Sequence, residues 1–196
     1  MPPGPRDRGG PARGRGRFAR PRSAPADPDS ADAARARAIA LLARRDHPRR
    51  ALKRRLADSG FAETAAESAV AALEDERLVD DARYVEATVA SRRGRGHGPL
   101  RIALELRREG VSADLVAAAV DPRAPHWAEA AAEQRRRRFG ALPPAGAAER
   151  ARQARFLLAR GFSGDQVRAA LGASADADLE LDGAELAAGE DGDGGE

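Results

Sequence analysis

One local pattern occurs three times in this chain, and the repetition restricts the fold more than any other feature. A helical stretch ends at a glycine that is followed at once by an apolar residue, at Gly60-Phe61, Gly110-Val111 and Gly161-Phe162. The glycines are 50 and 51 residues apart. Self-similarity at such a period is typical of repeat proteins, in which each unit packs against its neighbours.

The residues around each glycine predict how a helix stops and how the next one begins. A glycine just past a helix end adopts a left-handed backbone, and the apolar residue after it packs back onto that helix. Apolar residues then recur six and ten positions after each glycine, at Ala66 and Val70, Val116 and Val120, and Val167 and Leu171. A spacing of four places each pair on one face of a following helix.

Each unit also contains an earlier helix, which we expect at about residues 32–45, 80–93 and 125–139. Pro48 and Pro99 suit the first turn of the second helix in their units. The third helices begin behind polar residues that can cap them, namely Glu63 or Thr64, Ser112 with Asp114, and Ser163 with Asp165. The pattern predicts about nine helices and no strand. The few aromatic residues, Trp127, Tyr84 and the five phenylalanines, are expected to anchor the packing.

The two ends of the chain differ in composition from its middle. Residues 1–31 are rich in Pro, Gly and Arg, and residues 172–196 are rich in Asp, Glu, Gly and Ala. Neither end contains enough apolar surface to offset the chain entropy lost on folding. The sequence thus predicts an all-α, elongated array of three tandem three-helix repeats, covering 32–79, 80–122 and 123–171, between a disordered basic tail (1–31) and a disordered acidic tail (172–196).

The net charge of +3 conceals a strong asymmetry along the chain. The first 31 residues carry +4 and the last 25 carry −9, so the middle carries +8. A basic body suits nucleic acid or an acidic protein surface. Nearly all basic residues are arginine, which indicates a biased amino-acid composition. The arginines can therefore also be ordinary side chains on solvent-exposed helix faces. The acidic tail can mask the basic face, or it can serve only to keep the protein in solution.

Features of an enzyme or a membrane protein are missing from the sequence. The chain has no cysteine, no phosphate-binding glycine loop, and three histidines (His47, His97 and His126) without metal-ligand spacing. The acidic pair Asp80-Asp81 stands at an expected helix start, where carboxylates cap free N–H groups. No apolar run approaches the ~18 residues of a membrane span. We expect no catalytic residue, cofactor or metal, and a location in the cytoplasm.

Three stretches of sequence resemble the RecX family of regulatory proteins. Residues 40–61, ALLARRDHPRRALKRRLADSGF, are similar to the first repeat of that family. The central repeat is matched by residues 78–87, LVDDARYVEA, and by the series Arg92, Gly98, Ile102, Glu105, Leu106, Gly110 and Val111. The resemblance covers about residues 34–171. It is weakest in the third repeat, which contains the insertion Pro143-Pro144, and it includes neither tail.

The resemblance implies a non-enzymatic regulator of the RecA recombinase. Proteins of this family are curved stacks of three-helix repeats that lie in the groove of the RecA–DNA filament and inhibit its ATPase, strand-exchange and co-protease activities. The implied roles are in homologous recombination, in the regulation of DNA repair and in the SOS response. The expected partners are RecA, its nucleoprotein filament and, weakly and without sequence preference, DNA. We expect a monomer. The alternative is a stand-alone basic helical-repeat protein that binds nucleic acid.

The candidate contact residues are basic side chains of the first two repeats. They are Arg49, Arg50, Lys53, Arg54, Arg92, Arg93, Arg95, Arg101, Arg107 and Arg108. The run Arg135 to Arg138 is expected to extend the basic face into the third repeat. Glycines at 94, 96 and 98 would let the backbone of the middle loop approach a partner closely, unless that loop is merely flexible.

Overall fold

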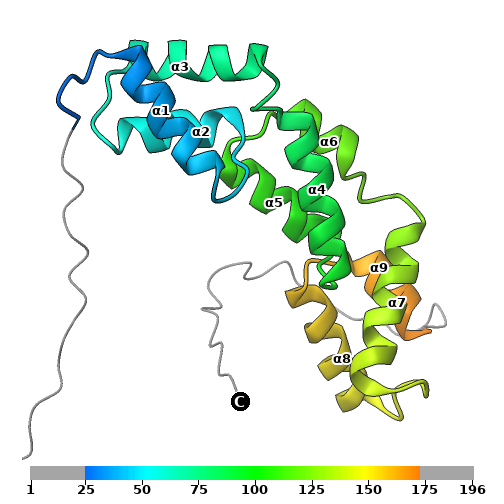
Figure 1. The fold of residues 1–196 in the computed structure, drawn as a ribbon. Coiled ribbons are helices and arrows are strands. Elements are labelled where there is room, and N and C mark those ends of the chain that lie inside the picture. The colour runs from blue at the N-terminus through cyan, green and yellow to red at the C-terminus, as the bar shows by residue number, and fades with distance from the viewer. Residues whose placement is uncertain (1–24, 173–196) are drawn as a thin grey trace, which may run out of the picture.

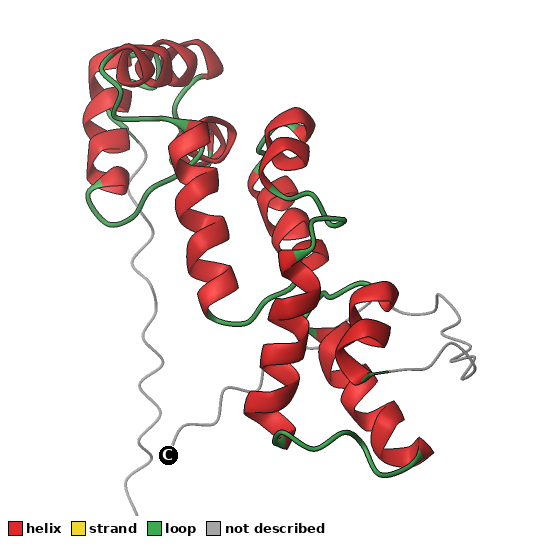
Figure 2. Cartoon of the chain, turned by 90° about the vertical axis from the view of Figure 1, so that its right-hand side faces the viewer, coloured by secondary structure: helices red, strands yellow, loops and turns green. Residues whose placement is uncertain are grey.

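The computed structural model describes residues 25–172, and within this range the chain forms helices only. The bounds are α1 Ala31–Leu42, α2 Arg49–Ala57, α3 Glu63–Asp75, α4 Asp81–Gly94, α5 Pro99–Glu109, α6 Ala113–Ala119, α7 His126–Phe139, α8 Ala147–Ala159 and α9 Gly164–Leu171. The all-α prediction is confirmed, and Figure 2 shows loops alone between the helices.

The helices gather in three consecutive groups along one long axis (Figure 1). The first group contains α1, α2 and α3, the second α4, α5 and α6, and the third α7, α8 and α9. The predicted elongated array of three-helix repeats is therefore correct. The groups are called repeats 1, 2 and 3 below.

The three glycine stops form as the sequence predicts. Gly60, Gly110 and Gly161 have φ angles of 94°, 91° and 86°, in the left-handed region. The next residue in each case donates its N–H to a leucine carbonyl five positions earlier, with N···O distances of 3.2, 3.1 and 3.2 Å for the pairs Phe61–Leu56, Val111–Leu106 and Phe162–Leu157. Each stop thus satisfies a helix-end carbonyl that would otherwise lack a partner.

Two of the three predicted caps are confirmed and one is wrong. Ser112 caps α6, and Ser163 forms a capping box with Gln166 at the start of α9. Helix α3 instead begins behind Ala62, which has no side-chain acceptor, so neither Glu63 nor Thr64 is its cap. Pro99 occupies the first turn of α5, whereas Pro48 lies one residue before α2.

The apolar residues form two separate cores within the described chain. One lies in repeat 1 and contains Leu52, Leu56, Val70 and Leu73. The other is shared by repeats 2 and 3, and it contains residues from both, such as Ile102, Leu106, Trp127, Leu157 and Phe162. Repeats 2 and 3 therefore form one packed unit, whereas repeat 1 has a core of its own.

The aromatic residues do not all anchor the core to the same extent. Trp127 and Phe162 are 1% exposed and lie at the centre of the shared core. Tyr84 packs against that core only partly buried, and Phe61 does so in repeat 1. Phe139 and Phe156 meet edge to face, with ring centroids 5.2 Å apart. Phe18 lies outside the described residues.

The predicted disorder of the two tails falls almost entirely outside the described residues. The exceptions are residues 25–31 and Gly172. Within the former, the Pro28 carbonyl accepts a hydrogen bond of 2.9 Å from the Ala62 N–H, and Ser30 caps α1. The packed part of the chain therefore begins before residue 32. None of the helices in the described range is long and apolar enough to cross a membrane.

Candidate functional site

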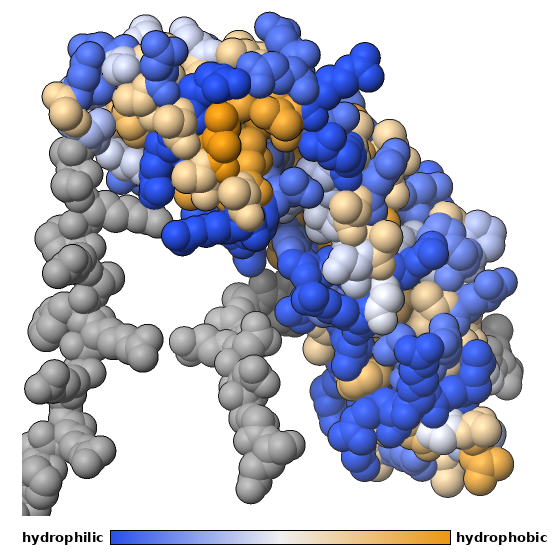
Figure 3. All heavy atoms as spheres, viewed as in Figure 1, coloured by the Kyte–Doolittle hydropathy of each residue, from blue (hydrophilic) through white to orange (hydrophobic). Residues whose placement is uncertain are grey.

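The ten candidate side chains lie on the second helices of repeats 1 and 2, at the end of α4 and in the loop after it. Helix α2 contains Arg49, Arg50, Lys53 and Arg54, the end of α4 and its following loop contain Arg92, Arg93 and Arg95, and α5 contains Arg101, Arg107 and Arg108. Figure 3 shows hydrophilic residues over much of the visible surface, interrupted by an apolar patch on repeat 1.

Three of the ten candidates are held in ion pairs inside their own repeats. Arg49 binds Glu67 and Glu74 of α3, at 2.6 and 2.7 Å, and Lys53 also binds Glu67. These hydrogen bonds, first from Lys53 and then from Arg49, lower the pKa of the Glu67 carboxyl. The positive charges of Arg49 and Lys53 are therefore partly neutralised within repeat 1.

Arg92 plays the same role in repeat 2, where it joins α4 to α5. Its Nε donates to both carboxylate oxygens of Glu105, at 2.9 and 2.8 Å, and its Nη2 completes a fork. This bond lowers the pKa of Glu105. Both side chains are about 30% exposed, at 28% and 30%, so the pair is partly shielded from water. As a partner contact, Arg92 stays a prediction.

The other candidates are exposed and, within residues 25–172, make no ion pair. One of them, Arg101, reaches the Ala159 carbonyl of repeat 3 at 3.5 Å. Six guanidinium groups therefore remain available to an outside partner, on Arg50, Arg54, Arg93, Arg95, Arg107 and Arg108.

The third repeat does not extend this face as its sequence suggests. Arg135 is only 6% exposed, and its guanidinium donates to the Leu142 and Ala141 carbonyls at 2.8 and 3.1 Å. It therefore holds the loop after α7 in place. Arg137 pairs with Glu133 one turn earlier. Only Arg136 and Arg138 of this run stay exposed and without an ion pair in the described part of the chain.

The repeats meet through the ends of their second helices. Gly110, at the end of α5, lies against Arg50 near the start of α2, where a Cβ on the glycine would be 2.8 Å from the Arg50 Cβ. Gly161, at the end of α8, lies against Arg101 near the start of α5, and its Cβ would be 2.5 Å from the Arg101 nitrogen. The same type of junction is used twice, about one repeat apart.

Hydrogen bonds at these junctions satisfy the free N–H groups of helix starts. The Asp81 carboxylate of repeat 2 accepts from the Arg49 N–H at 2.7 Å. At the second junction, the Gly98 and Leu100 N–H groups donate to the Arg160 and Gly161 carbonyls, at 2.7 and 3.0 Å. Because buried N–H groups left without partners are costly, these bonds restrict how the repeats are oriented.

Two of the three glycines at 94, 96 and 98 lie at this junction. Gly96 and Gly98 are buried, and a Cβ on Gly98 would be 2.5 Å from the Phe162 nitrogen. A Cβ on Gly96 would collide with the Gln134 side chain. Only Gly94 has open space around it. The predicted close backbone approach is thus real, but it takes place between repeats 2 and 3.

Two histidines lie at equivalent places beside the junctions. His47 precedes α2 and is 5% exposed, and His97 precedes α5 with its Nδ1 buried and without a hydrogen-bond partner. Burial lowers the pKa of both imidazoles, and nearby arginines lower it further, Arg55 for His47 and Arg101 for His97. Both rings therefore stay neutral at neutral pH. No cluster of metal-ligating side chains is found among the described residues.

Comparison with known proteins decides the family. Three family models match in order, described as the first, second and third three-helix domains of RecX, at residues 34–73, 80–120 and 128–171. The chain belongs to the RecX family of regulatory proteins. A curated RecX regulatory protein of Halorhodospira halophila is 45% identical over 149 residues, which cover 76% of this chain and 92% of that relative. One from Stenotrophomonas maltophilia is 41% identical over 134 residues, covering 68% and 82%.

Solved RecX structures share the fold. The crystal structure of RecX from Lactobacillus salivarius superposes with a TM-score of 0.62 at 19% identity, covering 72% of this chain and 94% of that one. The three RecX domains coincide with the three helix groups described above, so the resemblance noted in the sequence is confirmed as family membership.

Two features of this surface were missed in the sequence. The first is that the acidic partners of Arg49, Lys53 and Arg92 lie on neighbouring helices. The spacing of residues along one helix does not reveal such partners. The second is a pair of exposed leucines on α5, Leu100 and Leu104. A signal for them did exist, because the apolar residues of this helix cover more than the single face that a core requires.

Proposed function

We propose that this protein binds the RecA recombinase on its DNA filament and inhibits the ATPase, strand-exchange and co-protease activities of that filament. In the cell it would thereby regulate homologous recombination, DNA repair and the SOS response. One observation carries the proposal: all three RecX domains are present, in order and along the same chain. The protein acts by binding and needs no cofactor, and we propose that it does so as a monomer in the cytoplasm.

The shape and charge of the array support this role. A nucleoprotein filament repeats an acidic surface at regular intervals, and an elongated array of similar units can follow it over several subunits. The unpaired arginines lie on α2, at the end of α4, in the loop that follows it and on α5, so they occur at intervals along the array. Opposite charges on the two surfaces accelerate association and fix their register.

Any contact with DNA is expected to involve phosphates and not bases. Each phosphate neutralised on a duplex contributes roughly −0.9 to the slope of log affinity against log salt. A contact by all six unpaired arginines would give a slope of about −5. Base readout requires side chains presented to a groove, or aromatic rings for stacking, and such rings are few here.

Binding to labelled single-stranded DNA, measured by fluorescence anisotropy with and without RecA and a non-hydrolysable nucleotide, tests the proposal. We expect tight binding only when RecA covers the DNA. The double variant Arg93→Glu/Arg95→Glu should weaken that binding at least tenfold, about 1.4 kcal/mol. Arg136→Glu/Arg138→Glu, an equal charge change at exposed sites on α7, is the matched control.

The opposite pattern would support the alternative function. If the protein binds bare DNA tightly and RecA adds nothing, it is a stand-alone nucleic-acid-binding protein. Equal losses in the test and control variants would show that total charge matters and that the end of α4 and the loop after it have no special role.

A further inference from the structure

Helix α5 has a second apolar face that the described part of the chain leaves partly exposed. Leu100 and Leu104 are 42% and 40% exposed and lie one turn apart. The opposite side of the same helix is already occupied, because Ile102, Ala103 and Leu106 are buried in the shared core. A helix that packs on one side normally presents polar residues on the other, so two exposed leucines there indicate a contact surface.

Arginines flank these leucines on the same face. Positions three, four and eight residues apart share a helix face, which groups Leu100 and Leu104 with Arg101, Arg107 and Arg108. All three arginines are exposed, and none forms an ion pair within residues 25–172. These five residues are called the leucine–arginine face. Its chemistry fits a segment that contains both leucines and carboxylates, and it does not fit a phosphate backbone alone.

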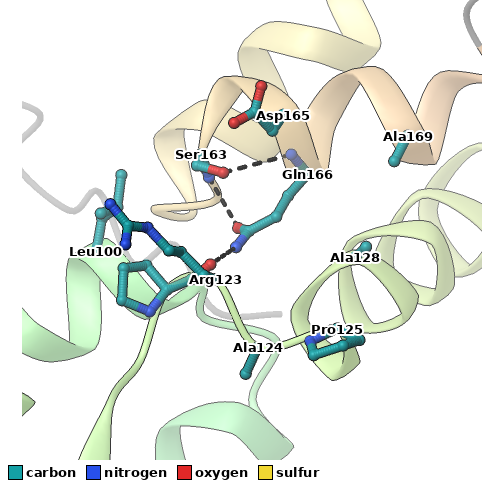
Figure 4. A pocket seen from close by; sticks show the side chains of 10 residues that line it. Leu100, Arg123, Ala124, Pro125, Ala128, Ser163, Asp165, Gln166 and Ala169 are labelled. Carbon is teal, nitrogen blue, oxygen red and sulfur yellow. Dashed lines mark hydrogen bonds between the residues drawn. The ribbon is translucent and has the colours of Figure 1, made fainter.

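The leucine–arginine face continues into an open pocket between repeats 2 and 3 (Figure 4). The pocket has a volume of about 530 Å³, and Leu100 forms part of its wall. Small apolar side chains line much of the remainder, namely Pro122, Ala124, Pro125, Ala128 and Ala169. Arg123 adds a further cation at the rim. The carboxylate that also lines the pocket, Asp165, is paired with Arg168. The pocket therefore suits an apolar side chain from an acidic segment.

The chain itself contains a segment of this composition. Residues 176–186 read DADLELDGAEL, with three leucines and five acidic residues, and no basic residue occurs from 173 to 196. Helix α9 supplies Ala169 to the pocket and ends at Leu171, so the segment starts five residues beyond that helix. At up to ~3.3 Å per residue, the intervening chain is long enough to bring the segment back to the pocket and α5.

We propose that residues 176–186 bind the leucine–arginine face and the adjoining pocket of the same molecule. The leucines enter the pocket and cover Leu100 and Leu104, and the carboxylates pair with Arg101, Arg107, Arg108 and Arg123. A short tether gives an effective concentration on the order of millimolar, so an intrinsically weak contact is sufficient. The tail then occupies a surface that an outside partner would otherwise use. This inference concerns the chain alone and holds whether or not RecA is that partner.

A nitroxide label on the tail of the full-length protein tests the contact. The chain has no cysteine, so Ala188→Cys gives a single attachment site beside the segment. Backbone amide signals are then compared by NMR with the label oxidised and reduced. We expect loss of most signal intensity at residues 100–108, 122–128 and 163–169, and little loss in α3.

Two leucine variants separate specific docking from charge attraction. Leu179→Ser/Leu181→Ser/Leu186→Ser keeps every acidic residue of the tail, and it should abolish the broadening. Leu100→Ser/Leu104→Ser should do the same from the other side. Leu142→Ser, at an exposed leucine of the α7–α8 loop, is the matched control and should change nothing. Absence of broadening in the parent protein overturns the proposal. So does broadening that survives the tail variant or spreads evenly over the arginines of α2 and α7.

Discussion

The glycines that end the second helices are needed for up to two physical reasons. Each adopts a positive φ, and two of them, Gly110 and Gly161, also let the start of the preceding repeat's second helix approach closely. A side chain there would be strained by the backbone and would collide with Arg50 or Arg101. These residues therefore determine both where a helix stops and how two repeats join.

Replacing Gly161 by alanine should lower the free energy of unfolding by more than the backbone strain alone would. Left-handed backbone costs an L-residue about 1–2 kcal/mol, and the collision with the Arg101 backbone adds to it. Gly172→Ala is the matched control, because Gly172 has a φ of 66° but nothing within 4 Å of its Cβ. Urea unfolding measures the difference. Equal losses for the two variants would contradict the role of Gly161 at the junction.

Acidification should lower the free energy of unfolding through His97, the histidine at the junction of repeats 2 and 3. Burial lowers its pKa below the ordinary value of 6.5, so the unfolded chain binds the proton more tightly than the folded one. The stability is fully present above about pH 6.5 and falls as the pH drops from there toward the folded-state pKa. His97→Gln should reduce this fall, whereas His126→Gln, at an exposed histidine, should not. Unfolding free energies between pH 7.5 and pH 5 check it, and identical pH profiles for His97→Gln and the parent protein would refute it.

At the level of residues, local chemistry was predictable and partners across helices were not. The left-handed glycines and the caps Ser112 and Ser163 follow from neighbours in the sequence. The ion pair between Arg92 and Glu105 depends instead on how α4 packs against α5. Spacing in one helix carries no information about that packing, so the sequence grouped Arg92 with the free arginines.

At the level of the helices, the main feature that the sequence did not predict is the division of the apolar residues into two cores. The first helix of each repeat, predicted at 32–45, 80–93 and 125–139, agrees with α1, α4 and α7 to within three residues, because the period of 50–51 residues brings three copies of the same signals into register. The sequence did not indicate that repeats 2 and 3 share a core while repeat 1 has its own. Every repeat carries the same apolar face, and only the three-dimensional arrangement determines which faces merge.

The two cores should open as two separate units. Leu56→Ala removes packing in repeat 1, and Leu157→Ala removes packing in the shared core, each at a cost of about 2–5 kcal/mol. Hydrogen exchange should therefore accelerate in α1–α3 alone for Leu56→Ala, and throughout α4–α9 for Leu157→Ala. Faster exchange over the whole chain in both variants would show a single cooperative unit.

For the molecule as a whole, the array combines a rigid pair of repeats with a first repeat joined through polar contacts. The first junction depends on the bond from the Arg49 N–H to Asp81 and on the approach of Gly110 to Arg50, without a shared apolar core. Unpaired arginines lie on both sides of it, on α2 and α5. The arginines of α2 and those of α5 therefore belong to two units with separate cores.

RecA ATPase activity on single-stranded DNA, with this protein titrated far below one copy per recombinase, tests the central claim most directly. The account predicts strong inhibition at these low ratios, because an array that blocks filament growth affects many subunits at once. Arg93→Glu/Arg95→Glu should require more protein for the same inhibition, and Arg136→Glu/Arg138→Glu should not. An ATPase rate that stays unchanged until the protein saturates the DNA would contradict regulation of the filament and indicate simple competition for DNA.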